Sequence, residues 1–327
     1  MTVSYIIENF KPVDLKELDC YRSAVAPILK YYNVDYKLLF LQRDLYLKYD
    51  EKLDCEQYDI FSLSDFFDDV GVLRSYVTDE SQDIISIIKS SIDHNRPIIA
   101  FFDSYYDDTF PAVYNKTHSR HACPIYGYDD ENFFVIGNDY VGDFKRIAKT
   151  MSIKTVHNCI EGYKKIYNNV PCIQIFSRYT VNDENYRDKY SNKYINFYCY
   201  HNVDIMKHLL SLREYVNFFE NNCFDEKIAL KHSCQSLIMF NDLVKIRISE
   251  YYGISRVFPN TYGLLKIDES IVEKGNYIRA VFYHAFNTKE IRKEMLEKSL
   301  NYIRDIIDLE IKRYNLLENF RTLVERR

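Results

Sequence analysis

The pattern of apolar residues changes near residue 180, and this change restricts the chain to folds with two dissimilar parts. Before it, short apolar runs bounded by Pro, Gly, Asp and Asn predict strands mixed with helices. After it, apolar residues recur at helical spacing over long stretches. The polar, tyrosine-rich stretch 179–200 separates the two patterns. We therefore predict an α+β fold, with one domain at 1–180 and a mainly helical domain at 181–327.

Individual elements can be predicted within this division. Strands are expected at 97–102, 122–128, 133–136 and 172–176, and the polar turn 129–132 should join the second and third as a hairpin. Helices are expected after Cys20 and over 83–92. The last helix should begin near Asn287, because Glu290 then takes the capping-box position, and it should run toward Val324.

Composition argues against several classes of function. The net charge is −5, so no strongly basic surface points to nucleic acid. The chain has only 8 Gly, and neither a dinucleotide motif nor a P-loop occurs. No secretory signal is visible and no apolar run approaches the roughly 20 residues that span a bilayer. We expect a cytoplasmic protein with no membrane partner and with reduced cysteines, none of them in a C-x-x-C pair.

Three residues in the first domain suggest nucleophilic catalysis. Cys20 directly precedes a predicted helix, whose N-terminus favours the thiolate form. His121 opens a predicted strand, and Asp139 follows in the next strand or its exit loop. Adjacent antiparallel strands can bring His121 and Asp139 together, so that the carboxylate orients the imidazole and the imidazole activates Cys20. The pattern predicts a Cys–His–Asp site that attacks an acyl group.

Simpler interpretations of these residues remain open. A single cysteine is more often a buried structural residue than a nucleophile. The spacing His118-x-x-His121-x-Cys123 could belong to a metal site, but it offers no obvious fourth ligand, and we predict none. Asp103, Tyr105 and Tyr106 follow the strand 97–102 and are either an ordinary polar loop or part of a substrate pocket.

The segment 97–130 resembles the signature of the butirosin biosynthesis protein H family. Its sequence is PIIAFFDSYYDDTFPAVYNKTHSRHACPIYGYDD. In that family a strand ends in Asp followed by a tyrosine pair. An H-x-x-H stretch then leads into a strand that closes with Gly-Tyr-Asp. The early pair Asp19-Cys20 matches as well, and the resemblance covers about the first half of the chain.

The resemblance implies a papain-like cysteine-peptidase fold that is used for acyl transfer in natural-product biosynthesis. An acyl chain would move from the phosphopantetheine thioester of an acyl or peptidyl carrier protein, through Cys20, to a small amine or diamine. By position, Cys20 matches the nucleophile, His121 the base and Asp139 the orienting acid. No resident cofactor is implied, because a thioester is already activated.

Further residues are candidates for substrate binding under this interpretation. Asp103 could pair with the ammonium of the acceptor, with Tyr105, Tyr106 and His118 around the same pocket. Tyr21 could also contact the substrate. Papain-like enzymes often have an oxyanion-donating Gln where this chain has Asp14, which cannot donate when ionised. The oxyanion hole would then use the Cys20 backbone N–H with a second donor, for which Tyr21, Asn138 and an amide from the segment before Cys20 are the candidates.

The helical domain is expected to cover the acyl and acceptor cleft and to keep water out. Two alternatives stay open, namely a cysteine peptidase of the same fold and a binding module without catalysis.

Overall fold

A computed structural model describes most of the chain: residues 4–13, 18–50, 52–77, 83–111, 113–138, 146–167, 170–179, 185–200, 202–222, 225–257 and 262–324. The fold is mixed α and β, as predicted. The chain forms two compact units. Unit 1 comprises Met1–Tyr36 and Ser64–Asp183, and unit 2 comprises Lys37–Leu63 and Glu184–Arg327. The predicted division placed residues 37–63 in the first domain, whereas by their contacts they belong to unit 2.

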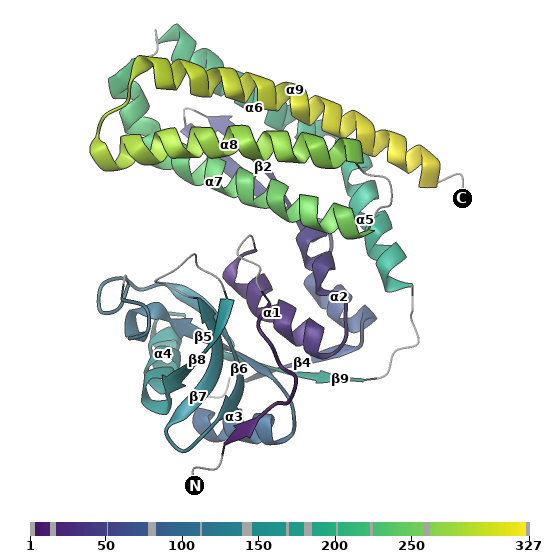
Figure 1. Cartoon of the computed structure of the whole chain (residues 1–327), viewed down its shortest axis with the longest axis vertical. Helices are drawn as coiled ribbons and strands as arrows, with labels where there is room; N and C mark the ends of the chain where they lie inside the picture. Colours follow the sequence, from purple (N-terminus) through teal and green to yellow (C-terminus); the bar gives the residue numbers. More distant parts are fainter. Residues whose placement is uncertain are drawn as a thin grey trace. The chain divides into compact units, whose positions relative to one another are not determined.

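Unit 1 is built on an antiparallel sheet of seven strands, in the order β4-β9-β5-β6-β7-β8, with β1 paired to β6 (Figure 1). Its elements are β1 (Tyr5–Ile6), α1 (Cys20–Tyr31), α2 (Leu63–Asp69), β4 (Val72–Val77), α3 (Ile84–Asp93), β5 (Ile98–Asp103), η2 (Ser104–Tyr106), β6 (Arg120–Tyr128), β7 (Asn132–Asn138), β8 (Arg146–Ser152), α4 (Ile153–Ile166) and β9 (Ile173–Arg178).

The four predicted strands and the helix over 83–92 are confirmed as β5, β6, β7, β9 and α3. Strand β5 is buried along its whole length: β6 and β9 pair with its two edges, and α3 and α4 contact it. The predicted hairpin joins β6 to β7. Its turn is closed by Asp129, whose carboxylate accepts the backbone N–H groups of Glu131 and Asn132 at 2.9 and 2.7 Å.

Helix α1 contacts β6, while α4 contacts β5 and η2. Pro27 lies inside α1, and the helix nevertheless continues to Tyr31. The helix residues from Arg22 to Leu29 are all buried. Burial of this stretch against the sheet compensates for the hydrogen bond that Pro27 cannot donate. Helix α1 is therefore held by packing, and its first residue, Cys20, is fixed relative to β6.

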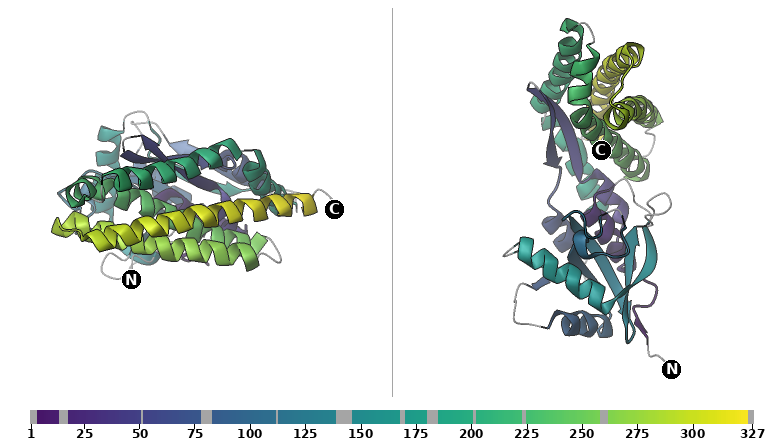
Figure 2. Two further views of the ribbon diagram at one scale, coloured as in Figure 1. Left: turned by 90° about the horizontal axis from the view of Figure 1, so that it is seen from above. Right: turned by 90° about the vertical axis from the view of Figure 1, so that its left-hand side faces the viewer.

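Unit 2 combines long helices with a two-stranded hairpin. Its elements are η1 (Tyr36–Leu41), β2 (Arg43–Asp50), β3 (Lys52–Asp59), α5 (Tyr186–Tyr200), α6 (Asn202–Asn221), α7 (Glu226–Val257), α8 (Tyr262–Thr288) and α9 (Lys293–Val324). Helix α8 packs against both α7 and α9 (Figure 1). The hairpin lies along α6 and α7 (Figure 2).

The predicted start of the last helix was wrong. Asn287 belongs to the end of α8, and α9 begins at Lys293. The hydroxyl of Thr288 accepts the backbone N–H of Glu290 at 3.2 Å, and Lys289 has a φ of 60°. The polar pattern that resembled an N-terminal cap therefore forms the turn between two helices.

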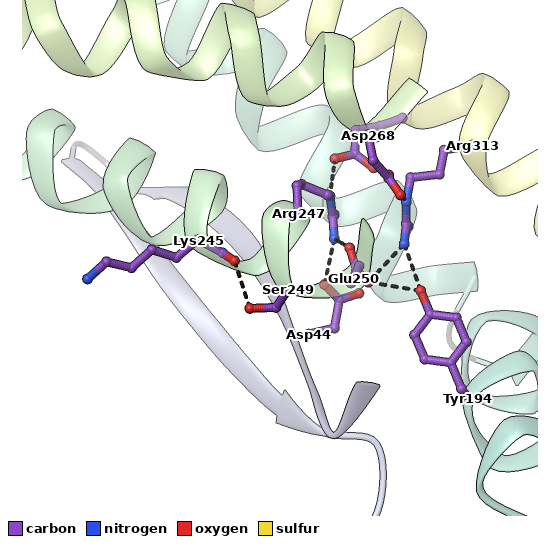
Figure 3. Close-up of polar contacts among 9 residues, drawn as sticks. Asp44, Tyr194, Lys245, Arg247, Ser249, Glu250, Asp268 and Arg313 are labelled. Carbon is purple, nitrogen blue, oxygen red and sulfur yellow. Dashed lines mark hydrogen bonds and ion pairs between the residues drawn. The ribbon is translucent and has the colours of Figure 1, made fainter. Parts of the chain in front are cut away.

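A buried network of charges lies inside unit 2 (Figure 3). Arg247 on α7 donates from Nη1 to Asp44 at 2.9 Å and from Nε to Glu310 at 2.8 Å, and it also pairs with Glu250. The Arg247 side chain is 1% exposed. Because Asp44 is on β2 and Glu310 is on α9, one guanidinium ties the hairpin to two helices.

A second arginine completes this network. Arg313 donates from Nε to Asp268 at 3.0 Å and from Nη2 to Tyr194 at 3.0 Å, and it pairs with Glu250 at 2.8 Å. Two arginines thus face four carboxylates. Burial raises the pKa of Asp268 to about 7, although Arg313 acts in the opposite direction. Asp268 therefore holds a proton at mildly acidic pH, and its buried Oδ2 atom has no hydrogen-bond partner among the residues that the structure describes.

Candidate functional site

The position of Cys20 is set by the capping of α1. Asp19 is the N-cap residue, and its carboxylate accepts the backbone N–H of Arg22 at 2.8 Å. The same carboxylate pairs with the Arg22 guanidinium. Because the cap fixes the first turn, the sulfur of Cys20 is presented at the helix N-terminus. The predicted helix after Cys20 is confirmed, with Cys20 as its first residue.

The thiol of Cys20 meets strand β6. The backbone N–H of Ala122 on β6 lowers the pKa of this thiol, and Arg146 on β8 donates to the Cys20 carbonyl oxygen at 3.2 Å. Burial raises the pKa of the Cys20 thiol, and the negative charge of Asp19 raises it further. The Ala122 N–H and the charges of Arg146 and Arg120 lower the pKa without cancelling these effects. The resting thiol is therefore protonated, contrary to what the helix N-terminus alone suggests.

His121 lies on the strand against which α1 packs. It lies on β6 opposite Phe102 of β5, immediately before Ala122. Its side chain is only partly buried, but its Nε2 atom has no access to solvent and no hydrogen-bond partner in the described part of the chain. Burial lowers the pKa of His121 to about 3, and the positive charges of Arg146 and Lys149 act in the same direction. The imidazole is neutral at physiological pH.

Asp139 lies outside the described residues, which end at Asn138 before resuming at Arg146. Asp14 is also outside the described residues. The orienting role of Asp139 thus remains a prediction.

Tyr21 is engaged in packing on the sheet. Its ring stacks on Phe101 with 6.0 Å between ring centroids, and its hydroxyl donates to Gln174 at 2.8 Å. Burial raises the pKa of the Tyr21 hydroxyl. The hydroxyl proton points to Gln174 of β9, so donation to a substrate oxyanion would require this bond to break.

The predicted pocket residues form a second histidine–carboxylate pair. Nδ1 of His118 donates to Oδ2 of Asp103 at 2.6 Å. The Asp103 side chain is fully buried, whereas the His118 side chain is 52% exposed. The other oxygen of Asp103 accepts the backbone N–H groups of Tyr105 and Ser119 at 3.1 and 3.2 Å. Asp103 is thus occupied by groups of the protein, and the structure leaves it no open face for an ammonium.

Two tyrosines hold the ring of His118. The Tyr105 ring stacks on it at 4.3 Å with an angle of 14°, and the Tyr106 ring meets it edge-on at 6.5 Å. Gly162 of α4 makes room for Tyr106, because a Cβ at this position would lie 2.3 Å from the Tyr106 ring. All four residues predicted to line a pocket therefore come together, through contacts with one another.

The arginines around the thiol were not among the predicted site residues. Arg120 lies over the Phe101 ring at 4.9 Å, and Arg146 opens β8. Both lower the pKa of Cys20. The pairing of Asp103 with His118 was also not predicted, although both residues were candidates. A polar residue at a strand end, followed by a histidine just before the neighbouring strand, is the signal that could have revealed it.

In the described residues, no three His, Cys, Asp or Glu side chains are grouped closely enough to hold a metal ion. The helices in this part of the chain are all too short or too polar to cross a bilayer. Searches for similar proteins found no family model that matches this chain and no matching curated protein.

Proposed function

We propose that this protein is a cysteine-dependent acyltransferase of papain-like fold that forms amide bonds in the cytoplasm. It would take an acyl chain from the phosphopantetheine thioester of a carrier protein, hold it on Cys20 and pass it to a primary amine. The observation that supports this most is the packing of α1, which begins at Cys20, against β6, the strand that carries His121. Papain-like chemistry requires a nucleophile within reach of a histidine base, and this packing brings together the two elements that carry them.

The electrostatics of the site suit a reactive acyl donor. The raised pKa of Cys20 and the lowered pKa of His121 both disfavour a resting thiolate–imidazolium pair. The proton must therefore leave the sulfur as the donor is attacked. The Ala122 N–H, Arg146 and Arg120 stabilise the negative charge that develops on the sulfur. A thioester can be attacked in this way without prior activation by a nucleotide.

In the first step the acyl group moves from the carrier sulfur to the Cys20 sulfur. The sulfur of Cys20 forms a bond to the acyl carbon, and the bond from that carbon to the carrier sulfur breaks. The Cys20 proton passes through His121 to the departing carrier thiolate, which leaves as a thiol. The product is an acyl-enzyme thioester on Cys20, and the carrier protein is released.

Intact-mass spectrometry tests the proposal. The full chain is mixed with carrier proteins that bear acetyl, octanoyl or benzoyl phosphopantetheine thioesters, and the mass increase is followed over time. We expect an adduct of acyl mass on the wild-type protein and none on Cys20→Ala. Cys234→Ala is the matched control, because Cys234 is an exposed free cysteine of unit 2, and it should be acylated like the wild type.

Two outcomes contradict the proposal. One is an adduct of equal yield on Cys20→Ala, which would show nonspecific acylation. The other is no adduct with any of the three donors. Peptide cleavage by the same preparation would then favour a peptidase, and its absence would favour a binding module.

A further inference from the structure

Besides His121, unit 1 has a second histidine, His118, whose ring is oriented by a carboxylate. His118 is held through Nδ1 by the fully buried carboxylate of Asp103 at 2.6 Å. This bond fixes the tautomer, so Nε2, on the opposite edge of the ring, keeps its lone pair as a proton acceptor. The ring is half exposed and can meet a molecule arriving from solvent.

Backbone hydrogen bonds set the orientation of the Asp103 carboxylate. Asp103 is the N-cap of η2, and its Oδ1 accepts the N–H groups of Tyr105 and Ser119. These bonds hold the carboxylate in one orientation, with Oδ2 toward His118. A buried carboxylate aimed at one ring nitrogen both orients an imidazole and stabilises its protonated form.

The ring plane is fixed as well. Stacking on Tyr105 and the edge contact with Tyr106 restrict rotation of His118, and Gly162 leaves Tyr106 little freedom to shift toward α4. An ordinary exposed loop histidine would lack this support. Fixing of a side chain by packing and by hydrogen bonds around it is what proton transfer at a defined point requires.

The pair lies at the same end of the sheet as Cys20. Asp103 is the last residue of β5 and faces Arg120, the first residue of β6. Ala122, whose N–H lowers the pKa of the Cys20 thiol, is two residues further on β6, or about 7 Å along a strand. Arg120 and Tyr21 both pack on Phe101, so the surroundings of the pair and of the thiol are continuous.

We propose that His118, oriented by Asp103, is the general base for the incoming amine, whereas His121 serves Cys20. This inference rests on the proposed acyl transfer and assigns its second step. The amine nitrogen forms a bond to the acyl carbon, and its proton passes to Nε2 of His118. The bond from carbon to the Cys20 sulfur breaks, and the sulfur leaves as a thiolate. His118 then gives the proton to solvent or back to the thiolate.

The surroundings of His121 and His118 support these two separate roles. Nε2 of His121 is buried, and Arg146 and Lys149 place positive charge near it, so a lasting imidazolium there is costly. His118 has a buried carboxylate partner and contact with solvent, so a proton taken at its Nε2 atom has a path to solvent. An amine also enters from solvent, where His118 is accessible.

The two steps can be measured separately on the full chain. Acyl-Cys20 is first formed with a benzoyl thioester of N-acetylcysteamine, and excess thioester is removed. A primary amine, propylamine, is then added, and loss of the adduct and formation of the amide are followed by mass. We expect His118→Ala to acylate within about twofold of the wild type but to form amide about 10²-fold more slowly or worse.

Control variants separate catalysis from folding. His157→Ala removes an exposed histidine of α4 and should leave both steps unchanged. Asp103→Asn should slow amide formation, because a neutral partner stabilises the protonated ring less. If Asp103→Asn does not fold, His118→Ala still tests the inference, because the His118 side chain is half exposed.

Chemical rescue distinguishes a proton-transfer role from a structural one. Added imidazole should restore amide formation by His118→Ala, and methylated imidazoles should restore it in order of their basicity. Normal amide formation by His118→Ala would overturn the inference while leaving the proposed function intact. An equal loss in the acylation step, or rescue that ignores basicity, would also overturn it. If the wild type forms no acyl-Cys20, both the inference and the proposed function fail.

Discussion

Asp19 has two opposing effects on its neighbour Cys20. As the N-cap residue it fixes the helix that presents the sulfur, but its negative charge raises the pKa of the thiol. A neutral cap would keep the first effect and remove the second, since Asn caps helices about as well as Asp. The residue is therefore a convenient point at which to change the reactivity of the thiol without changing its position.

We predict that Asp19→Asn lowers the pKa of Cys20. Removal of a nearby negative charge stabilises the thiolate, so the thiolate fraction at neutral pH should rise severalfold. The measurement is the rate of iodoacetamide alkylation at Cys20 as a function of pH, read by mass spectrometry. The exposed Cys234 of the same molecule serves as the internal reference. A pKa that stays the same or rises would show that Asp19 does not control the thiol.

Asp268 should make the stability of the protein depend on pH. Its folded-state pKa is raised to about 7 by burial, against an ordinary value of 3.8. Between these values the folded protein binds more protons than the unfolded chain, so this residue's contribution to stability falls as pH rises. The loss is absent below about pH 4 and complete above about pH 7. The opposite slope applies to Glu310, whose pKa is lowered by Arg247 and Arg313 despite its burial.

Asp268→Asn isolates this contribution, because Asn is uncharged at every pH. Relative to the wild type, the variant should gain free energy of unfolding between pH 5 and pH 8, by more than about 1 kcal/mol. Urea denaturation at both values, followed by circular dichroism, measures the difference. A difference between variant and wild type that is constant with pH would mean that Asp268 does not titrate in this range.

At the scale of the elements, the buried arginines of unit 2 connect segments that are far apart in sequence. Arg247 joins α7 to β2 and α9, and Arg313 joins α9 to α8 and α5. The helices contribute charged residues to the interior, where an unpaired charge is costly. The network thus penalises any packing of the helices in which these partners are separated.

We predict that Arg247→Met destabilises the protein by about 3–5 kcal/mol, because it leaves Asp44 and Glu310 buried without their cation. Arg304→Met is the matched control. Arg304 pairs with Glu220 at the surface, where both side chains are about 40% exposed, and its loss should cost no more than about 1 kcal/mol. Chemical denaturation of both variants gives the comparison. Equal effects would show that burial of the pair is unimportant.

Local sequence patterns were sufficient for several elements of unit 1. Strands β5 and β9 are apolar runs between turn residues, and the hairpin of β6 and β7 has a polar turn whose Asp129 side chain closes it. These signals are contained within a few residues of the element itself. By contrast, the hairpin of β2 and β3 was missed, because its sequence is rich in charge and its packing partners are helices from the far end of the chain.

The candidate site was predicted in its residues but only partly in its arrangement. The predicted helix and strand positions were enough to place Cys20 at the start of a helix and His121 on a strand. The pairing of Asp103 with His118 depends on the path of the chain between them, which sequence periodicity does not encode. The arginines near the thiol come from strand starts that have no distinguishing pattern, so their effect on the pKa of Cys20 appears only in three dimensions.

For the whole molecule, the two units are interleaved along the chain, since residues 37–63 interrupt unit 1 and belong to unit 2. During synthesis the hairpin therefore emerges long before its helical partners. Strand β3 ends at Asp59, whereas α7 begins at Glu226. At usual elongation rates, synthesis of the residues between the end of β3 and the start of α7 takes roughly 8 to 33 s. Throughout that interval on the ribosome, Arg247, the arginine that Asp44 pairs with in the folded protein, has not yet been synthesised.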